Sequence, residues 1–128
     1  MAKDTISTTD APAAIGTYSQ AVCAGGILYI SGQIPLDPIT MELVSSDAEV
    51  QIRQVFSNLS AICAAAGTDL NNALKLTIYL TDLQDFPIVN KVMEERFSSP
   101  YPARAAIGVN ALPRGVSVEI DAIVAVQS

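Results

Sequence analysis

The chain has 128 residues, half of them hydrophobic and 16% charged, with a net charge of −6. This length predicts one domain over residues 1–128 with a sizeable core. Seven Lys and Arg against 13 Asp and Glu leave no basic stripe for a phosphate backbone, so we expect no nucleic-acid partner. The sequence has no apolar run of roughly 18–20 residues and no apolar leader segment, which predicts a cytoplasmic protein without membrane contact.

The low charge content also bears on assembly. A small domain has much surface to cover, and a sequence this apolar favours burial of part of that surface against other copies of the chain. An unusually rich single core is the alternative explanation.

The chain contains no His and only two cysteines, Cys23 and Cys63. In a reducing compartment both are expected to be free thiols. The lack of His excludes Ser-His-Asp and Cys-His catalysis and removes the commonest transition-metal ligand. We therefore expect no metal and no cofactor, and chemistry carried by other polar side chains, backbone groups or water.

The first half of the chain predicts two strands followed by a helix. One strand ends near residue 22, and a Gly25-Gly26 turn leads into the second, over 27–31. After a loop over 32–46, Ser46 and Glu49 have the spacing of a capping box, and Gly67 suits the end of the helix. The helix is amphipathic, with a predicted apolar face of Ile52, Val55, Leu59, Ile62, Cys63 and Ala66 and a predicted solvent face of Gln51, Arg53, Gln54, Ser57, Asn58 and Ser60.

The second half predicts a strand, a helix and two strands. Residues 73–80 alternate, with Leu74, Leu76, Ile78 and Leu80 on one face. Asp85 is expected to cap a helix over 86–97 that has Pro87 in its first turn. The two final strands, over 103–109 and 116–126, flank the turn at 112–115.

This order of elements predicts an α+β fold, a mixed β-sheet with two helices packed on one face. The sheet face away from the helices is expected to carry a few polar side chains in a half-apolar setting, the kind of surface that forms sites when another subunit covers it. These side chains are predicted to be Lys75, Thr77, Tyr79, Arg104, Glu119 and Asp121.

Arg104 and Glu119 are the strongest candidates for chemistry. The planar guanidinium of Arg104 lies among small apolar residues and could anchor a substrate carboxylate in bidentate geometry. From spacing alone, an ion pair with Glu119 or Asp121 on the same sheet face explains Arg104 better. Glu119 could orient a water or relay a proton, or it could serve only as a partner for an Arg. The spacing leaves open which of Glu119 and Asp121 points into a site.

Three further residues are weaker candidates for binding. Tyr18 could stack on, or hydrogen-bond to, a planar substrate, although packing explains a lone tyrosine as well. Ser31 and Gly32 end the second predicted strand, where a glycine lets the backbone approach a ligand closely.

Together these segments resemble the Rid (RidA, or YjgF-type) family. The matching blocks follow the family's order over nearly the whole chain: residues 14–21 (AIGTYSQA), 29–35 (YISGQIP), 64–67 (AAAG), 85–90 (DFPIVN), 102–104 (PAR), 112–115 (LPRG) and 118–120 (VEI). The resemblance implies a chorismate-mutase-like fold of the bacillus type and a homotrimer with clefts between subunits.

The resemblance also implies an activity, that of a 2-iminobutanoate/2-iminopropanoate deaminase. Such an enzyme hydrolyses reactive 2-imino and 2-enamino acids, such as 2-aminoacrylate and 2-aminocrotonate, to 2-oxo acids and ammonia, which protects against metabolite damage. It implies that Arg104 holds the substrate carboxylate, that Glu119 positions the attacking water, and that Tyr18, Ser31 and Gly32 line the cleft.

This chain departs from the family pattern at three positions. Thr17 stands where many members have proline, Ala106 where many have cysteine, and Met41 where the family's Thr-Gly turn has glycine. The alternative function is a non-catalytic regulatory or chaperone-like protein that binds small carboxylates through Arg104. A nuclease or translation inhibitor conflicts with the acidic charge and the lack of His.

Overall fold

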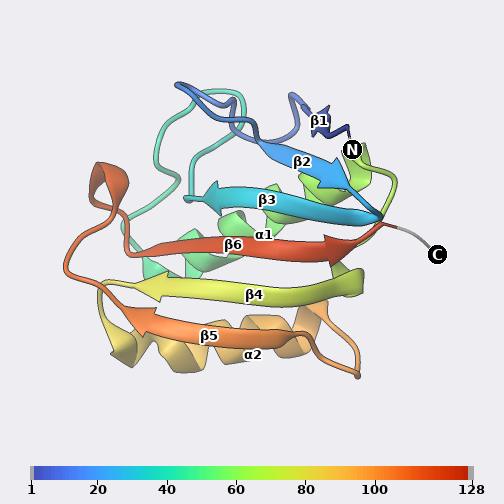
Figure 1. Ribbon diagram of the computed structural model, residues 1–128. Coiled ribbons are helices and arrows are strands. Elements are labelled where there is room, and N and C mark those ends of the chain that lie inside the picture. The colour runs from blue at the N-terminus through green and yellow to red at the C-terminus, as the bar shows by residue number, and fades with distance from the viewer. Residues whose placement is uncertain (1, 127–128) are drawn as a thin grey trace.

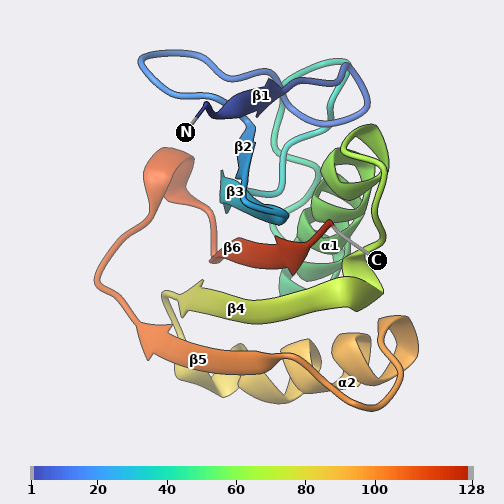
Figure 2. The ribbon, with the colours of Figure 1, turned by 45° about the vertical axis from the view of Figure 1, so that its right-hand side comes forward.

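The computed structural model describes residues 2–126 and has two layers, a six-stranded mixed sheet and two helices on one of its faces (Figures 1 and 2). The strand order is β1-β2-β3-β6-β4-β5. The elements are β1 (Asp4–Ile6), β2 (Ala21–Ala24), β3 (Ile27–Gln33), α1 (Ala48–Ala65), β4 (Ala73–Leu80), α2 (Phe86–Arg96), β5 (Ala103–Gly108) and β6 (Val118–Ala125). Short 3₁₀ turns cover Leu70–Asn72, Leu83–Asp85 and Pro113–Gly115.

The sheet topology places segments from both ends of the chain side by side. The β2–β3 hairpin turns at Gly25 and Gly26, both with positive φ. β6 lies between β3 and β4 and is antiparallel to both, whereas β5 is parallel to β4 and reached through α2. β1 was not predicted, because its three residues show no alternation and are held in place by pairing with β2.

The core lies between the sheet and the helices. One face of β6 is buried at Val118, Ile120, Ala122 and Val124, so its side chains alternate between the core and the open face. The predicted apolar face of α1 packs against it, and Val89, Val92 and Met93 of α2 belong to the same core. Phe56 on α1 meets Phe97, just after α2, edge to face with ring centroids 6.0 Å apart, so the helices also contact each other.

The helix α1 starts one residue later than predicted. Its N-cap is Asp47, whose side chain accepts a hydrogen bond from the Val50 N–H at 3.0 Å, so the predicted cap at Ser46 is wrong. Asp47 is the N-cap in place of Ser46 because its side chain reaches the free N–H groups of the first helical turn. The predicted end of the helix is confirmed, since Gly67 has φ +78° and its N–H bonds to the Ala64 carbonyl at 3.0 Å.

Two polar side chains of α1 are buried rather than on the solvent face predicted for them. Asn58 donates to the carbonyls of Ile34 and Leu36 at 3.3 and 3.1 Å. Gln51 donates to the Ser45 carbonyl at 2.9 Å and accepts from the Ser117 N–H at 2.8 Å. Loop backbone groups that cannot reach water need such partners, so both amides tie α1 to the loop before it and to the start of β6.

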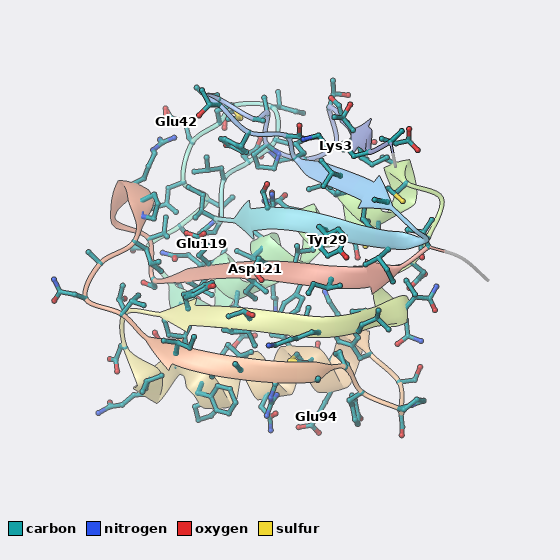
Figure 3. All side chains as sticks on the ribbon, in the orientation of Figure 1. Lys3, Tyr29, Glu42, Glu94, Glu119 and Asp121 are labelled. Carbon is teal, nitrogen blue, oxygen red and sulfur yellow. The ribbon has the colours of Figure 1, made fainter. Side chains whose placement is uncertain are left out.

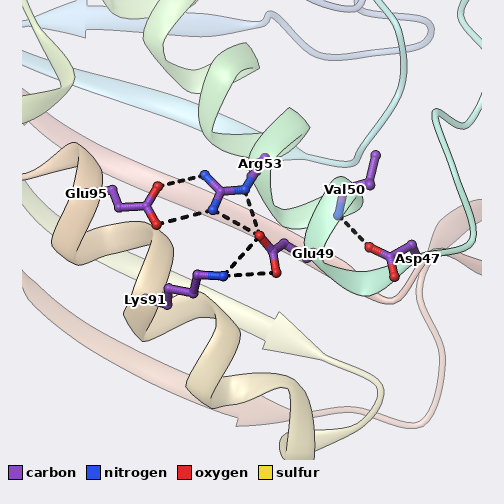
Figure 4. A network of polar contacts seen from close by, with 6 residues as sticks. All are labelled: Asp47, Glu49, Val50, Arg53, Lys91 and Glu95. Carbon is purple, nitrogen blue, oxygen red and sulfur yellow. Dashed lines mark hydrogen bonds and ion pairs between the residues drawn. The ribbon is translucent and has the colours of Figure 1, made fainter.

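The solvent side of the two helices is joined by an ion-pair network (Figure 4). Arg53 on α1 pairs with Glu49 at 3.0 Å and with Glu95 on α2 at 2.9 Å, and Lys91 on α2 pairs with Glu49 at 3.3 Å. All four side chains are substantially exposed, so the network fixes the relative orientation of the helices more than it adds stability.

A bulge in β4 changes one prediction for that strand. Ala73 pairs with Val124 and Lys75 with Ile123, so two steps along β4 match one step along β6. The extra residue, Leu74, is 47% exposed, and its predicted place on the apolar face is wrong, whereas Leu76, Ile78 and Leu80 are buried as predicted.

Both cysteines are free, as expected. Cys63 is buried, and burial raises the pKa of its thiol to about 12, which makes it a packing residue and not a nucleophile. None of the helices within residues 2–126 combines the length and apolar content needed to span a bilayer.

Candidate functional site

The sheet face away from the helices carries most of the polar residues predicted for it. Figure 3 shows Tyr29, Glu119 and Asp121 on the side turned to the viewer, with the helices behind the sheet. Tyr79 on β4 pairs with Glu119 on β6, and its hydroxyl donates to the Asp121 carboxylate at 3.1 Å. This bond holds Asp121 over β4 and distinguishes its environment from that of Glu119.

Glu119 lies against a glycine at a second bulge. Ile30 pairs with Ala122 and Gln33 with Ile120, so three steps along β3 match two along β6 and the pairing is interrupted at Ser31 and Gly32. A Cβ added at Gly32 would collide with the Glu119 carboxylate and lie 2.9 Å from its Cδ. Only a glycine leaves this carboxylate its place above β3.

The surroundings of Glu119 oppose its ionisation. Burial raises the pKa of the Glu119 carboxyl, and the nearby negative charge of Asp121 raises it further. The pKa of the Tyr79 phenol is also raised, by burial and by its bond to Asp121, so Tyr79 acts as a donor and not as an ionising group. A carboxyl with a raised pKa beside a polar cluster can exchange a proton with a bound molecule or a water.

Arg104 lies on the other face of the sheet, so its predicted position beside Glu119 and Asp121 is wrong. In the β4–β5 pairing Arg104 is opposite Leu76, which is buried beneath the helices. The Ala-rich sequence of β5 does not reveal which of its two sides faces α2. The suggested ion pair with Glu119 or Asp121 is likewise absent among the salt bridges of residues 2–126.

Residues of α2 hold the guanidinium of Arg104 in place. Its Nη1 donates to Asn90 Oδ1 at 2.8 Å and contacts Met93 Sδ at 3.4 Å, and its Cζ lies 4.7 Å from the centre of the Phe86 ring. Within residues 2–126, Nε and Nη2 have no hydrogen-bond partner. The side of the guanidinium formed by Nε and Nη2 is therefore available to a carboxylate, next to a cavity of about 430 Å³ lined by Tyr101, Pro102 and Glu94.

Tyr18 and Ser31 are brought together at the opposite side of the molecule. The Ser31 hydroxyl donates to the Ser19 carbonyl at 2.6 Å, which fixes the chain beside Tyr18. Tyr18 is 52% exposed and lines a cavity of about 530 Å³ together with Ser31, Lys3 and Tyr29. It also borders a second cavity, of about 320 Å³, together with Gly32.

Sequence reasoning missed the side chains that position these residues. Gln20 is buried, and its amide donates to the carbonyls of Thr8, Ala11 and Pro12 at 3.0, 3.3 and 2.7 Å, which secures the segment leading to Tyr18. Asn90 and Phe86 likewise hold the Arg104 side chain in place, through a hydrogen bond and a cation–π contact. Their residue types gave no signal, because each acts through a contact distant in sequence.

The candidate residues thus form two separate groups in one chain. Tyr18, Ser31, Gly32 and Glu119 gather around β3 and β6, whereas Arg104 lies at β5 over α2. Only β4 separates β5 from Glu119 on β6, a distance of roughly 10 Å at the usual strand spacing, but Glu119 and Arg104 lie on opposite faces of the sheet. A small molecule bound on one face therefore does not reach both Glu119 and Arg104 within one chain.

Comparison with known proteins assigns this chain to a family. Residues 8–126 match the family model described as Endoribonuclease L-PSP. The 2-iminobutanoate/2-iminopropanoate deaminase of Mus musculus is 51% identical over 118 residues, which cover 92% of this chain and 87% of that protein. The chain therefore belongs to the Rid family, also called the YjgF or L-PSP family.

Solved structures lead to the same assignment. RidA from the Antarctic bacterium Psychrobacter sp. is 53% identical with a TM-score of 0.92, and the match covers 95% of this chain and 98% of that one. Escherichia coli TdcF, solved with bound serine, is 40% identical with a TM-score of 0.89 over 98% of this chain and 99% of its own.

The influence of Asp121 on Glu119 can be tested directly. The variant Asp121→Asn keeps an acceptor for the Tyr79 hydroxyl but removes the negative charge, so the pKa of Glu119 should fall towards its ordinary value. A raised carboxyl pKa stabilises the fold only at low pH, and this contribution is lost as the pH rises through the folded-state value, so the variant should lose less stability than wild type between acidic and neutral pH.

The measurement is a carbon-13 titration of the carboxyl groups by NMR, with urea unfolding at several pH values. Asp10→Asn, an exposed position in the N-terminal loop, serves as the control and should leave the Glu119 titration unchanged. An unaltered Glu119 titration in Asp121→Asn would contradict the assigned coupling.

Proposed function

We propose that the protein is a single-domain deaminase that hydrolyses 2-imino acids, formed directly or from their 2-enamino tautomers, to 2-oxo acids and ammonia. The observation that carries this proposal is the guanidinium of Arg104, held by Asn90 and Phe86 with Nε and Nη2 free for an anion. The deaminase name of the mouse relative supports the same reaction.

Arg104 supplies the substrate anchor. A carboxylate accepts two parallel hydrogen bonds from one side of a guanidinium, so binding fixes both the position and the plane of a 2-imino acid. The cation–π contact with Phe86 and the bond to Asn90 restrict the rotamers of Arg104 before substrate arrives. Orientation contributes strongly to rate when the second reactant is a water.

Glu119 serves as the general base and general acid of the proposed reaction. Its ionised carboxylate accepts a proton from the water whose oxygen attacks the imine carbon, and the C=N π electrons become a lone pair on nitrogen, which takes up a proton from solvent water. Glu119 then gives its proton to the amine nitrogen, and the C–N bond breaks. The new hydroxyl loses its proton to solvent water as the C=O bond forms and ammonia leaves. A carboxyl with a raised pKa suits both directions of transfer.

The proposal requires a second copy of the chain. Arg104 and Glu119 lie on opposite faces of the sheet, so we infer a homotrimer of the chorismate-mutase-like kind, in which Arg104 of one subunit meets Tyr18, Ser31, Gly32 and Glu119 of its neighbour. The apolar side chains of Tyr29 and Ile107, 47% and 43% exposed on the open face, support burial of this face by another subunit.

A non-catalytic receptor for small carboxylates is the second candidate. The bound serine in TdcF favours it, because serine carries the carboxylate that Arg104 would hold. Glu119 argues for catalysis, since a carboxylate receptor has no use for an acidic group beside the ligand. The endoribonuclease description of the family model has less support in this chain, whose charge is −6 and which has no His.

The reaction can be followed in a coupled assay. A serine or threonine dehydratase generates the imine, semicarbazide competes for it, and 2-oxo acid formation is recorded with and without the protein. Wild type should accelerate 2-oxo acid release, and Arg104→Ala should lose at least about 30-fold, because truncating one partner of a buried charge pair costs roughly 2–5 kcal/mol. The exposed Arg53→Ala is the matched control and should retain activity.

Suppose that folded wild-type protein accelerates 2-oxo acid release with neither the serine nor the threonine dehydratase, yet binds 2-oxo acids through Arg104. This result would contradict the deaminase proposal and favour a non-catalytic carboxylate receptor. Equal activity of Arg104→Ala and wild type would contradict the anchor.

The contact between Gly32 and Glu119 gives a second prediction. Gly32 does not have a positive φ, so the backbone tolerates Gly32→Ala, but the new methyl group displaces the Glu119 carboxylate. We expect a folded protein whose kcat falls at least about 100-fold, the lower end of the range for losing a positioned general acid–base group. The kinetics of Gly32→Ala, Glu119→Gln and the double variant test this. Because Gly32 acts through Glu119, the two losses should not add, and additive losses would contradict the assigned contact.

A further inference from the structure

The thioether of Met93 contacts the cation of the proposed site. Arg104 Nη1 lies 3.4 Å from Met93 Sδ and donates to Asn90 Oδ1 at 2.8 Å, so one nitrogen of the guanidinium is shared by two side chains of α2. Met93 is 3% exposed, and its buried position on α2 restricts movement of the sulfur away from Arg104. A thioether is only a weak acceptor, so this contact leaves the charge of Arg104 available to an anion.

The contact between the sulfur and the guanidinium adjoins open space. Met93, Asn90 and Arg104 all line the cavity of about 430 Å³ beside β5. A water molecule takes up roughly 30 Å³ of liquid volume, and hydrogen peroxide is only slightly larger. A cleft that admits a 2-imino acid to Arg104 therefore also admits hydrogen peroxide to the sulfur of Met93.

Three other sulfur-containing side chains within residues 2–126 lie elsewhere. Met41 is in the loop before α1, Cys23 is on β2, and Cys63 is buried on α1. The lining residues of the cavity beside Arg104 include none of these three. Among these sulfur atoms, oxidation at Met93 is therefore the change that alters the surroundings of Arg104.

Hydrogen peroxide converts a thioether into a sulfoxide. A lone pair of the sulfur attacks one peroxide oxygen and the O–O bond breaks. The departing hydroxide takes the proton from the oxygen now bound to sulfur, so sulfoxide and water form. Sulfur is oxidised by two electrons and the peroxide is reduced. At Met93 the new oxygen is a buried polar acceptor that requires a donor, and Arg104 Nη1, already beside the sulfur, supplies one.

The added oxygen displaces the guanidinium. N–H···O bonds span roughly 2.7–3.2 Å, so an oxygen bound to the sulfur has no room between two atoms that are only 3.4 Å apart. Arg104 must rotate or move away from α2, which loosens its bond to Asn90 and its contact with Phe86. Bidentate binding of a carboxylate depends on the position and plane of the guanidinium, so the anchor is weakened.

We propose that Met93 is a redox-sensitive modification site, at which hydrogen peroxide forms a sulfoxide that binds Arg104 Nη1 and weakens the carboxylate anchor. This assignment rests on the proposed function, because it gives regulation to the residue that would hold the substrate. Methionine sulfoxide reductases reduce both epimers of the sulfoxide, so the change is reversible.

The test compares peroxide-treated and untreated samples of wild type, Met93→Leu and, as the matched control, Met41→Leu. Catalase removes the peroxide, dithiothreitol reverses oxidation of the cysteines, and mass spectrometry of peptides locates each added oxygen. Calorimetry measures the binding of pyruvate, the product from 2-iminopropanoate. Oxidised wild type should bind pyruvate about 10–100-fold more weakly, the effect of losing one hydrogen bond to a charged group.

Met41→Leu should show the same loss on oxidation, whereas Met93→Leu should bind pyruvate equally before and after treatment. Methionine sulfoxide reductases A and B should restore binding to oxidised wild type. Met93 that stays unoxidised at peroxide concentrations that oxidise Met41 would overturn the proposal. Unchanged pyruvate affinity after oxidation of Met93 would do the same, as would global unfolding of the oxidised protein in circular dichroism.

Nitrogen-15 NMR of the Arg104 guanidinium gives a readout that does not depend on substrate. Its signals should shift when wild type is oxidised and stay in place in peroxide-treated Met93→Leu. This shift supports the modification site even if wild type binds no pyruvate and hydrolyses no imine, in which case the proposed function alone fails. Unshifted Arg104 signals in protein oxidised at Met93 would overturn the inference and leave the deaminase proposal standing.

Discussion

The two faces of the sheet impose the constraint on which the whole account depends. Side chains along a strand alternate between faces, so β5 directs Arg104 towards α2 while β6 directs Glu119 away from the helices. No rotamer change brings one side chain through the sheet to the other. A site that uses both residues must therefore take them from two different subunits. For this reason the proposed enzyme requires an oligomer.

Rigid local structure supports each half of the proposed site. Around Glu119, the bulge at Ser31 and Gly32 opens room for a carboxylate, and Tyr79 fixes the adjacent Asp121. Around Arg104, α2 supplies a hydrogen bond and an aromatic face. Buried amides on α1 and in the Tyr18 segment secure the intervening loops. Such support holds functional groups in reactive geometry without strain in the groups themselves.

Much of the fold could be predicted from the sequence, because its helices and inner strands have strong apolar periodicity. The predictions were wrong where contacts with residues distant in sequence outweigh the local hydrophobic pattern. Asn58 looks like a solvent-face residue until the loop carbonyls beside it are known, and Leu74 leaves the core only because a bulge shifts its register. The candidate residues could be found from their chemistry and from the motif resemblance. The face that carries Arg104 could not be predicted, since small residues on both sides of β5 give no hydrophobic contrast.

Mixed assemblies test the central claim, that Arg104 and Glu119 of different subunits form one site. Inactive Arg104→Ala and Glu119→Gln chains would be unfolded together at equal concentration, refolded and assayed for imine hydrolysis. Random mixing in a closed trimer leaves about one quarter of the clefts with both groups intact, so about a quarter of wild-type activity should return. Activity that stays at the level of the separate variants, in assemblies shown by mass spectrometry to be mixed, would contradict a site shared between subunits.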